Sequence, residues 1–328
     1  MSRFTLAAAV AAAAVLAASP VAAQMAAPKQ QFMSIATSSV GGSWFPLGGA
    51  MAKVITEAYP QLKITAEVTG GTADNLKLLK NGQVELALST NDQAYLARKG
   101  EGAFANGAVT NFKGLLGGHA IIWQFYVLKS SGIASLKDLK GKRVSLGAAG
   151  SIGGPTGQIV MNAYGLKMST DWRPEYIGHG DGPGALLDGR VDGVLIISSA
   201  PTAAVTDITS RRGEDVVFLN PEKAILDKLF VEHPYWFPAV IPGGVYKGHP
   251  KDIPNSFGSS TILVASDKVA DEAAYAVVKA LIEGHQKLVA ANALAKEWTR
   301  ENATRGIVGV MPFHPGAEKY LKEAGILK

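Results

Sequence analysis

Short runs of β-branched residues alternate along this chain with helical patterns, and a loop rich in glycine and hydroxyl residues separates the two in each unit. Short strands that alternate with helices are typical of α/β proteins with mostly parallel sheets. The expected strands cover residues 32–36, 62–68, 84–88, 143–147, 191–197 and 261–265. The expected helices cover residues 46–58, 72–80, a segment capped by Asn91 or Asp92, residues 155–164, a segment starting at Pro201, and residues 267–284.

Four of the small-residue loops, at residues 37–45, 70–72, 89–92 and 148–156, directly precede expected helices. In open α/β sheets such loops meet at the carboxyl ends of the strands, where free backbone N–H groups suit an anion. The candidate ligand-binding residues are Ser38, Ser39, Gly41, Gly42, Ser43, Trp44, Phe45, Gly71, Thr72, Asn91, Asp92, Gly150, Ser151, Gly153, Ser198 and Ser199. A plainer alternative stays open for several of them, because glycine also permits tight turns, Thr72, Asn91 and Asp92 suit helix caps, and the two aromatic residues suit a core.

The first 23 residues have the layout of a cleaved secretory signal. Arg3 gives a positive start, residues 6–18 are apolar, and small residues at Val21 and Ala23 suit a signal peptidase. A membrane anchor is the alternative, but the apolar run is short and rich in alanine. We therefore expect cleavage after Ala23 and a periplasmic mature protein.

Composition excludes several classes of protein. A mature chain of about 300 residues suits two lobes better than one core. The absence of cysteine rules out disulfides and thiol catalysis, and the six histidines lack metal-ligand spacing, so we expect no metal and no cofactor. The net charge of +5 is dispersed rather than gathered in a stripe, which argues against nucleic-acid binding and is compatible with an anionic ligand.

Seven short segments, in order along the chain, resemble those of the TAXI family, the receptors associated with TRAP transporters. The opening segment, residues 35–50, reads IATSSVGGSWFPLGGA, and residues 69–76 read TGGTADNL. The others are residues 81–92, 136–144, 188–201, 241–248 and 314–317. The resemblance therefore covers almost the whole mature chain.

The resemblance implies a type II periplasmic binding protein fold, with lobe I at residues 29–122 and 257–328 and lobe II at residues 123–256. It implies no enzymatic activity but a solute receptor that hands a small anionic or zwitterionic molecule, such as glutamate or a dicarboxylate, to a TRAP-type permease. Asp92 would indicate a zwitterion if it faced the ligand. The chain departs from the family pattern at Ser38, Ser39, Trp44 and Phe45 and in the loop at residues 150–154, so the ligand stays open.

Two other functions compete with this interpretation. A binding protein of an ABC transporter would share the fold and the segment at residues 136–144. A hydrolase would use Ser151, in a loop that resembles a nucleophile elbow, with Asp192 and His233 in an order that a triad allows. The glycine-rich segment at residues 180–185 resembles part of a dinucleotide-binding motif, but it lacks the βαβ spacing.

Overall fold

The computed structural model describes residues 25–328, so the expected signal segment lies outside the described residues. The helices are α1 (Trp44–Ala58), α2 (Thr72–Lys80), α3 (Asn91–Lys99), α4 (Gly153–Ala163), α5 (Gly182–Leu187), α6 (Ala203–Arg212), α7 (Lys223–Glu232), α8 (Asp271–Glu283), α9 (His285–Ala291) and α10 (Pro315–Glu323). The strands are β1 (Gln31–Ala36), β2 (Leu62–Glu67), β3 (Leu86–Thr90), β4 (Phe112–Leu128), β5 (Arg143–Ser145), β6 (Arg173–Glu175), β7 (Gly193–Ser198), β8 (Val216–Phe218), β9 (Phe237–Ile241) and β10 (Ile253–Ser266).

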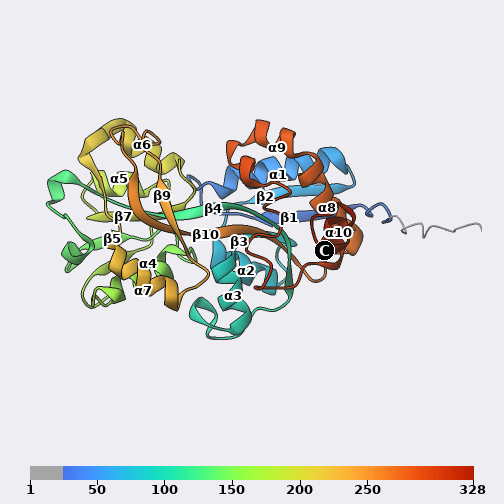
Figure 1. Ribbon diagram of the computed structural model, residues 1–328, viewed down its shortest axis with the longest axis horizontal. Helices are drawn as coiled ribbons and strands as arrows, with labels where there is room; N and C mark the ends of the chain where they lie inside the picture. The colour runs from blue at the N-terminus through green and yellow to red at the C-terminus, as the bar shows by residue number, and fades with distance from the viewer. Residues whose placement is uncertain (1–24) are drawn as a thin grey trace, which may run out of the picture.

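All ten strands join one continuous sheet in the order β2-β1-β3-β10-β4-β7-β5-β6, with β8 on β4 and β9 on β10. The outer strands pair in parallel, whereas β4 and β10 run antiparallel to their neighbours. The expectation of mostly parallel pairing is therefore wrong for the centre of the sheet. There the two longest strands carry the chain from one half of the molecule to the other and back (Figure 1).

The sheet divides where its two long strands change partners. Along β4, the pairing partner changes from β10 to β7 at Ile122. Along β10, it changes from β9 to β4 at Gly258. We call the part built on β1, β2 and β3 lobe one and the part built on β5, β6 and β7 lobe two. Figure 1 shows the two lobes side by side, with β4 and β10 running between them. We place the hinge at these two crossings.

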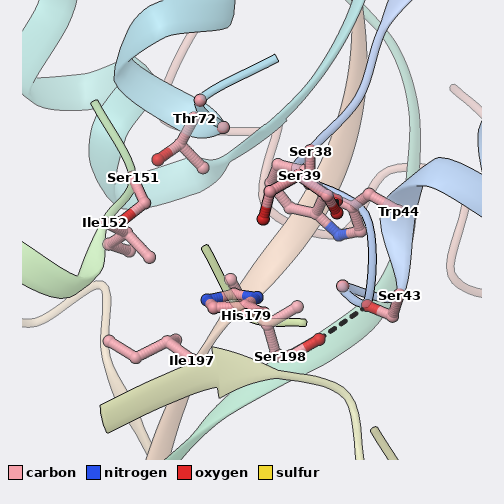
Figure 2. Close-up of a pocket in the computed structure, with 14 residues that line it drawn as sticks. Ser38, Ser39, Ser43, Trp44, Thr72, Ser151, Ile152, His179, Ile197 and Ser198 are labelled. Atoms are coloured by element: carbon pink, nitrogen blue, oxygen red, sulfur yellow. Dashed lines mark hydrogen bonds between the residues drawn. The ribbon is translucent and has the colours of Figure 1, made fainter. Parts of the chain in front are cut away.

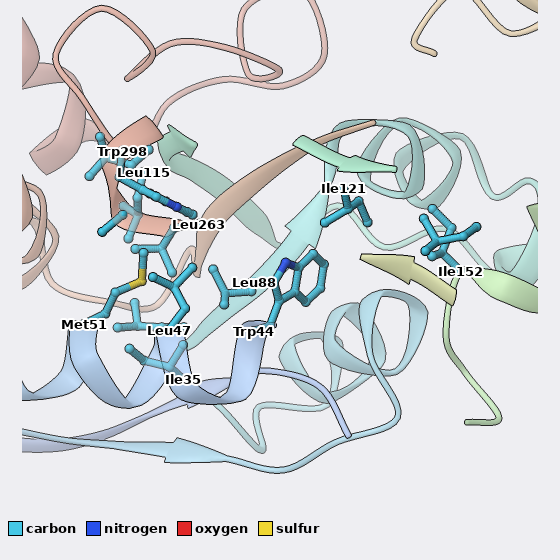
Figure 3. Close-up of a cluster of buried hydrophobic side chains, with 14 of the residues drawn as sticks. Ile35, Trp44, Leu47, Met51, Leu88, Leu115, Ile121, Ile152, Leu263 and Trp298 are labelled. Atoms are coloured by element: carbon cyan, nitrogen blue, oxygen red, sulfur yellow. The ribbon is translucent and has the colours of Figure 1, made fainter. Parts of the chain in front are cut away.

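Alternating side chains explain why helices cover both faces of each lobe. In lobe one, Leu263 of β10 packs with α1 and α8, while its neighbours Ile262 and Val264 pack with α2 and α3. In lobe two, Leu195 packs with α4 and α7, and its neighbour Ile196 packs with α5 and α6. Period-two alternation in a central strand gives this two-sided burial. Figure 3 shows the largest core cluster, which extends from Met51 in lobe one to Ile152 in lobe two.

Several helix starts differ from their predicted positions. The first residue outside α2 is Gly71, so Thr72 is the first helical residue and its side chain makes no cap. Thr90 precedes α3, so Asn91 and Asp92 lie inside that helix. Asp267 lies four residues before α8, where its backbone N–H donates to Asn111. Among residues 25–328, no helix has the length and apolar character needed to cross a membrane.

Candidate functional site

A hollow of about 390 Å³, measured with its opening to solvent, lies between the two lobes. Lobe one lines it with Ser38, Ser39, Gly42, Ser43, Trp44, Gly70, Gly71, Thr72 and Ile121. Lobe two lines it with Ser151, Ile152, His179, Ile197 and Ser198. Figure 2 shows the hydroxyls of Ser38, Ser39 and Thr72 on one side of this cleft and Ile197 and Ser198 on the other. We call it the interlobe cleft.

One buried amide joins two loops and a strand of lobe one. The Nδ2 group of Asn75 donates to the carbonyl oxygens of Thr37 and Leu88, at 2.7 Å each. Its Oδ1 atom accepts a hydrogen bond from the Thr69 hydroxyl at 2.5 Å. Since these partners belong to β3 and to the loops that follow β1 and β2, one side chain fixes the loops relative to one another. Lobe one therefore presents its side of the cleft as a preformed surface.

The starts of α1 and α2 both face the interlobe cleft. Ser43 precedes α1 and Gly71 precedes α2, and no side chain caps either helix start. The first backbone N–H groups of a helix have no partner within the helix, so they favour a negative charge. The Thr72 hydroxyl, on a residue only 2% exposed, also has no hydrogen-bond partner among the described residues.

Lobe two holds its side of the cleft with separate contacts. The Ser151 hydroxyl donates to the carbonyl oxygen of Leu146 at 3.1 Å and accepts from the Gly153 N–H at 3.3 Å. Buried Gln124 donates to the carbonyl oxygens of Ser198 and Ser199, at 2.9 and 3.3 Å. Gln124 also accepts a hydrogen bond from the Tyr246 hydroxyl, whereas the Ser151 hydroxyl bonds only within its own loop. Neither residue joins the Ser151 loop to the loop after β7.

His179 reaches the interlobe cleft from the loop between β6 and α5. Its Nδ1 atom is buried and has no hydrogen-bond partner in residues 25–328. A side-chain carbon added at Gly42 of lobe one would lie 3.3 Å from that atom. Burial lowers the pKa of His179 to about 4, so the imidazole is neutral near neutral pH.

Sequence reasoning did not identify His179. The signal was present, because His179 precedes the glycine-rich segment considered as a dinucleotide-binding motif, after a short strand and before a helix. It is a fifth loop of the same kind as the four that were recognised.

The lobes are in direct contact around the cleft. The Gly180 N–H donates to the carbonyl oxygen of Val40 at 3.2 Å. The Ala73 and Asp74 N–H groups donate to the carbonyl oxygen of Gly150, at 3.1 and 3.3 Å. The hydroxyls of Ser198 and Ser43 bond at 2.8 Å, as Figure 2 shows. The structure is therefore a closed form, in which loops from both lobes surround the cleft.

A chain of buried hydrogen bonds positions the cleft-lining indole of Trp44. Trp44 Nε1 donates to the Thr261 hydroxyl at 3.3 Å, and that hydroxyl lies 3.4 Å from Nε2 of His119. Trp298 donates to Nδ1 of His119 at 2.9 Å, so the neutral ring carries its proton on Nε2. Burial lowers the pKa of His119 to about 3. Trp44 thus both packs in the core and lines the cleft.

Nine of the sixteen predicted residues line the interlobe cleft: Ser38, Ser39, Gly42, Ser43, Trp44, Gly71, Thr72, Ser151 and Ser198. Two more, Gly41 and Gly150, lie at the contacts between the lobes, opposite Gly180 and Asp74. Gly153 packs against the carbonyl oxygen of Leu146, Ser199 is buried beside the cleft, and Phe45 lines a separate hollow near Pro46.

Asn91 and Asp92 lie away from the cleft lining. Asn91 donates to the carbonyl oxygen of Tyr235 and accepts from the Ser260 N–H. The carboxylate of Asp92 accepts a hydrogen bond from Trp236 Nε1 at 3.4 Å. Because Asp92 does not face the cleft, the argument for a zwitterionic ligand loses its basis.

The three residues considered for a hydrolase triad each have other partners. Asp192 forms an ion pair with Arg143 at 3.0 Å, and His233 contacts the Tyr235 hydroxyl at 2.9 Å. Ser151 bonds within its own loop. They do not form a catalytic arrangement.

Three solved structures are similar to this chain to different degrees. PhnD1 from Prochlorococcus marinus, in complex with methylphosphonate, is 10% identical, with a TM-score of 0.53 over 82% of this chain and 92% of that one. A putative L-cystine ABC transporter protein from Listeria monocytogenes is 15% identical, with a TM-score of 0.50 over 82% and 95% of the two chains. The alkanesulfonate-binding protein SsuA from Xanthomonas axonopodis pv. citri, bound to MOPS, is 16% identical, with a TM-score of 0.47 over 90% and 85%.

At these identities the similarity concerns the fold alone. The chain has the mixed α/β fold of type II periplasmic binding proteins, as expected. A model of the NMT1-like family matches residues 35–325. Because that match covers most of its length, the chain belongs to the NMT1-like family.

Proposed function

We propose that this protein is a solute-binding protein of a membrane transporter, and that it holds a small anion in the interlobe cleft. The observation that carries this proposal is the enclosure of the cleft by loops of both lobes, with two helix starts and several hydroxyls directed into it. Neutral donors and helix N-termini suit an anion. The complex of PhnD1 with methylphosphonate supports the same class of ligand.

The mechanism that we infer is capture followed by closure. The ligand binds to the preformed surface of lobe one, and lobe two then rotates about the hinge in β4 and β10. The contacts at Val40, Gly150 and Ser43 form only on closure, so a ligand that touches both lobes stabilises the closed state. The transporter would recognise that closed state.

Two kinds of transporter remain candidates. The resemblance to TAXI receptors favours a TRAP-type permease, whereas the L-cystine protein of the same fold belongs to an ABC transporter. The structural comparisons support the ABC partner better. The neighbouring genes decide the question, because a TRAP permease gene would support the first partner and an ATPase gene the second.

Thermal unfolding tests the proposed function. The mature protein would be refolded without ligand and heated with glutamate, 2-oxoglutarate, succinate, simple sulfonates, phosphonates and neutral amino acids. A ligand at about 100 times its dissociation constant adds about 2.7 kcal/mol of stability, a shift of several degrees. A shift with one or more acids supports the proposal. A shift with neutral amino acids alone, or native mass spectra in which the purified protein carries an uncharged ligand, would contradict it.

A further inference from the structure

The cleft lining contains no charged side chain. Of the described residues that line it, none is Asp, Glu, Lys or Arg. The nearby carboxylate of Asp74 is engaged by the Gly70 N–H at 2.9 Å and does not line the cleft. A ligand therefore meets no fixed cation that would balance a second negative charge, and no fixed anion that would balance an ammonium group.

Two buried polar atoms in the cleft lining have no hydrogen-bond partner among the described residues. They are the Thr72 hydroxyl oxygen and Nδ1 of His179. A buried polar atom without a hydrogen bond is costly, so a bound group that satisfies both would be favoured. At the start of α2 the Ala73 and Asp74 N–H groups already donate to the carbonyl oxygen of Gly150, which leaves the backbone N–H of Thr72 for a ligand. An oxyanion can accept from the hydroxyl and N–H of Thr72, and from His179 in the tautomer that carries its proton on Nδ1.

Besides its serines and glycines, the lining contains four large apolar side chains. Trp44 and Ile121 come from lobe one, and Ile152 and Ile197 come from lobe two. All four are at most 8% exposed. Figure 2 shows Ile152 and Ile197 together on the lobe-two side of the cleft. Charge placed against such side chains loses its hydration without compensation, whereas a hydrocarbon chain gains by burial.

We propose that the interlobe cleft selects an anion with a single charge and an apolar tail, whose charged head is held by Thr72 and His179 and whose tail lies against Ile152 and Ile197. This inference rests on the proposed function and narrows its ligand class. It excludes dicarboxylates and amino acids as preferred ligands. A carboxylate and a sulfonate share the required head chemistry.

Two matched series of compounds test the selection by calorimetry. The carboxylate series is butyrate, succinate and 3-aminopropanoate, which differ only in carrying a methyl, a carboxylate or an ammonium group at the far end. The sulfonate series is propane-1-sulfonate, ethane-1,2-disulfonate and 2-aminoethane-1-sulfonate. We expect the singly charged member of at least one series to bind more than about tenfold tighter than its two partners.

The outcomes separate the inference from the proposed function. Tighter binding of succinate, the disulfonate or either amino compound would overturn the inference and leave an anion-binding or zwitterion-binding receptor in place. No binding of any of the six compounds, combined with a shift by neutral solutes in the unfolding panel, would overturn both. The series with the tighter singly charged member identifies the head group.

Variants test the assigned positions. Thr72→Val keeps the shape of the side chain and removes the hydroxyl, and we expect affinity for the singly charged compound to fall about 10-fold to 100-fold. Thr206→Val, on the exposed side of α6, is the matched control and should leave affinity unchanged. Unchanged affinity in Thr72→Val would remove Thr72 from the head site.

A gain of function tests the tail. Ile197→Lys supplies a cation where the tail is expected, so succinate should then bind better than butyrate. Should Ile197→Lys unfold, Ile152→Lys, in the loop before α4, makes the same test. An unchanged preference for butyrate in a folded lysine variant would contradict the placement of the tail.

Discussion

The two lobes build their sides of the cleft in different ways. In lobe one, Asn75 joins the loops after β1 and β2 to β3, so the hydroxyls around Thr72 are fixed before a ligand arrives. In lobe two, Gln124 fixes the loop after β7, while Ser151 is held only within its own loop. The difference indicates a division of labour, in which lobe one recognises the charged head and lobe two adds the apolar wall and closes the cleft.

The largest expected effect comes from removing the residue that joins the loops of lobe one. Asn75→Ala leaves the carbonyl oxygens of Thr37 and Leu88 buried without a partner, so we expect a loss of about 3–5 kcal/mol in the free energy of unfolding and loss of ligand binding. Urea titration measures the first and calorimetry the second. Asn81→Ala, at the exposed end of α2, should change stability by less than about 0.5 kcal/mol. Equal effects of the two substitutions would show that lobe one is not organised by Asn75.

One buried histidine in each lobe makes the stability of the protein depend on pH. Burial in the core of lobe one lowers the pKa of His119 from its ordinary value of 6.5 to about 3. Between these pKa values the unfolded chain therefore binds a proton at His119 that the folded protein does not bind. The stability present above pH 6.5 is lost as the pH falls toward 3. Between these limits His119 contributes a slope of up to about 1.4 kcal/mol per pH unit.

His119→Gln keeps an acceptor for Trp298 and a donor for Thr261 without a titrating group, so urea titrations over this pH range should show a flatter slope. His179→Gln should flatten it less, because opening of the cleft alone relieves the burial of that imidazole. An unchanged slope in His119→Gln would contradict the account of its buried, neutral ring.

A smaller effect tests closure. A side-chain carbon at Gly70 would lie 2.4 Å from the carbonyl oxygen of Ala149 in lobe two, so Gly70→Ala obstructs the closed form. We expect affinity to fall about tenfold or more while the unfolding free energy stays near that of wild type. Calorimetry and urea titration together make the test. Wild-type affinity in this variant would mean that ligand binding does not require the contacts seen here between the lobes.

The smallest effect tests whether the lobes unfold together. Gly49 in α1 and Gly184 in α5 have open space where a side-chain carbon would be added. Each Gly→Ala substitution should stabilise its helix by about 0.5–1 kcal/mol. Because β4, β10 and one core cluster extend through both lobes, both variants should raise the same unfolding transition in calorimetry. Two transitions, each moved by only one variant, would show that the lobes unfold independently.

The sequence allowed most of lobe one to be predicted, because its strands and helices are short, alternating and separated by glycine-rich loops. Strand β4 was missed, since it is buried on both faces and therefore shows no period-two pattern. Its antiparallel pairing, and that of β10, cannot be read from strand-and-helix order. These two strands explain why the sheet is mixed.

Part of the candidate site could also be predicted, because some of its loops follow strands that the sequence pattern reveals. Loops that follow recognisable strands led to Ser38, Ser43 and Thr72, which line the cleft. His179 was missed because β6 has only three residues and contains Pro174. The sequence therefore showed no strand pattern before the loop that carries His179. Ile152 and Ile197 of lobe two were not among the predicted site residues, and only the closed arrangement shows that they line the cleft.

A crystal structure of the protein with butyrate or propane-1-sulfonate, whichever binds more tightly, tests the central claim most directly. The account predicts closed lobes, an anionic oxygen within hydrogen-bond distance of the Thr72 hydroxyl and of His179 Nδ1, and a hydrocarbon tail against Ile152 and Ile197. An anion bound outside the interlobe cleft, or one that touches only one lobe, would contradict it.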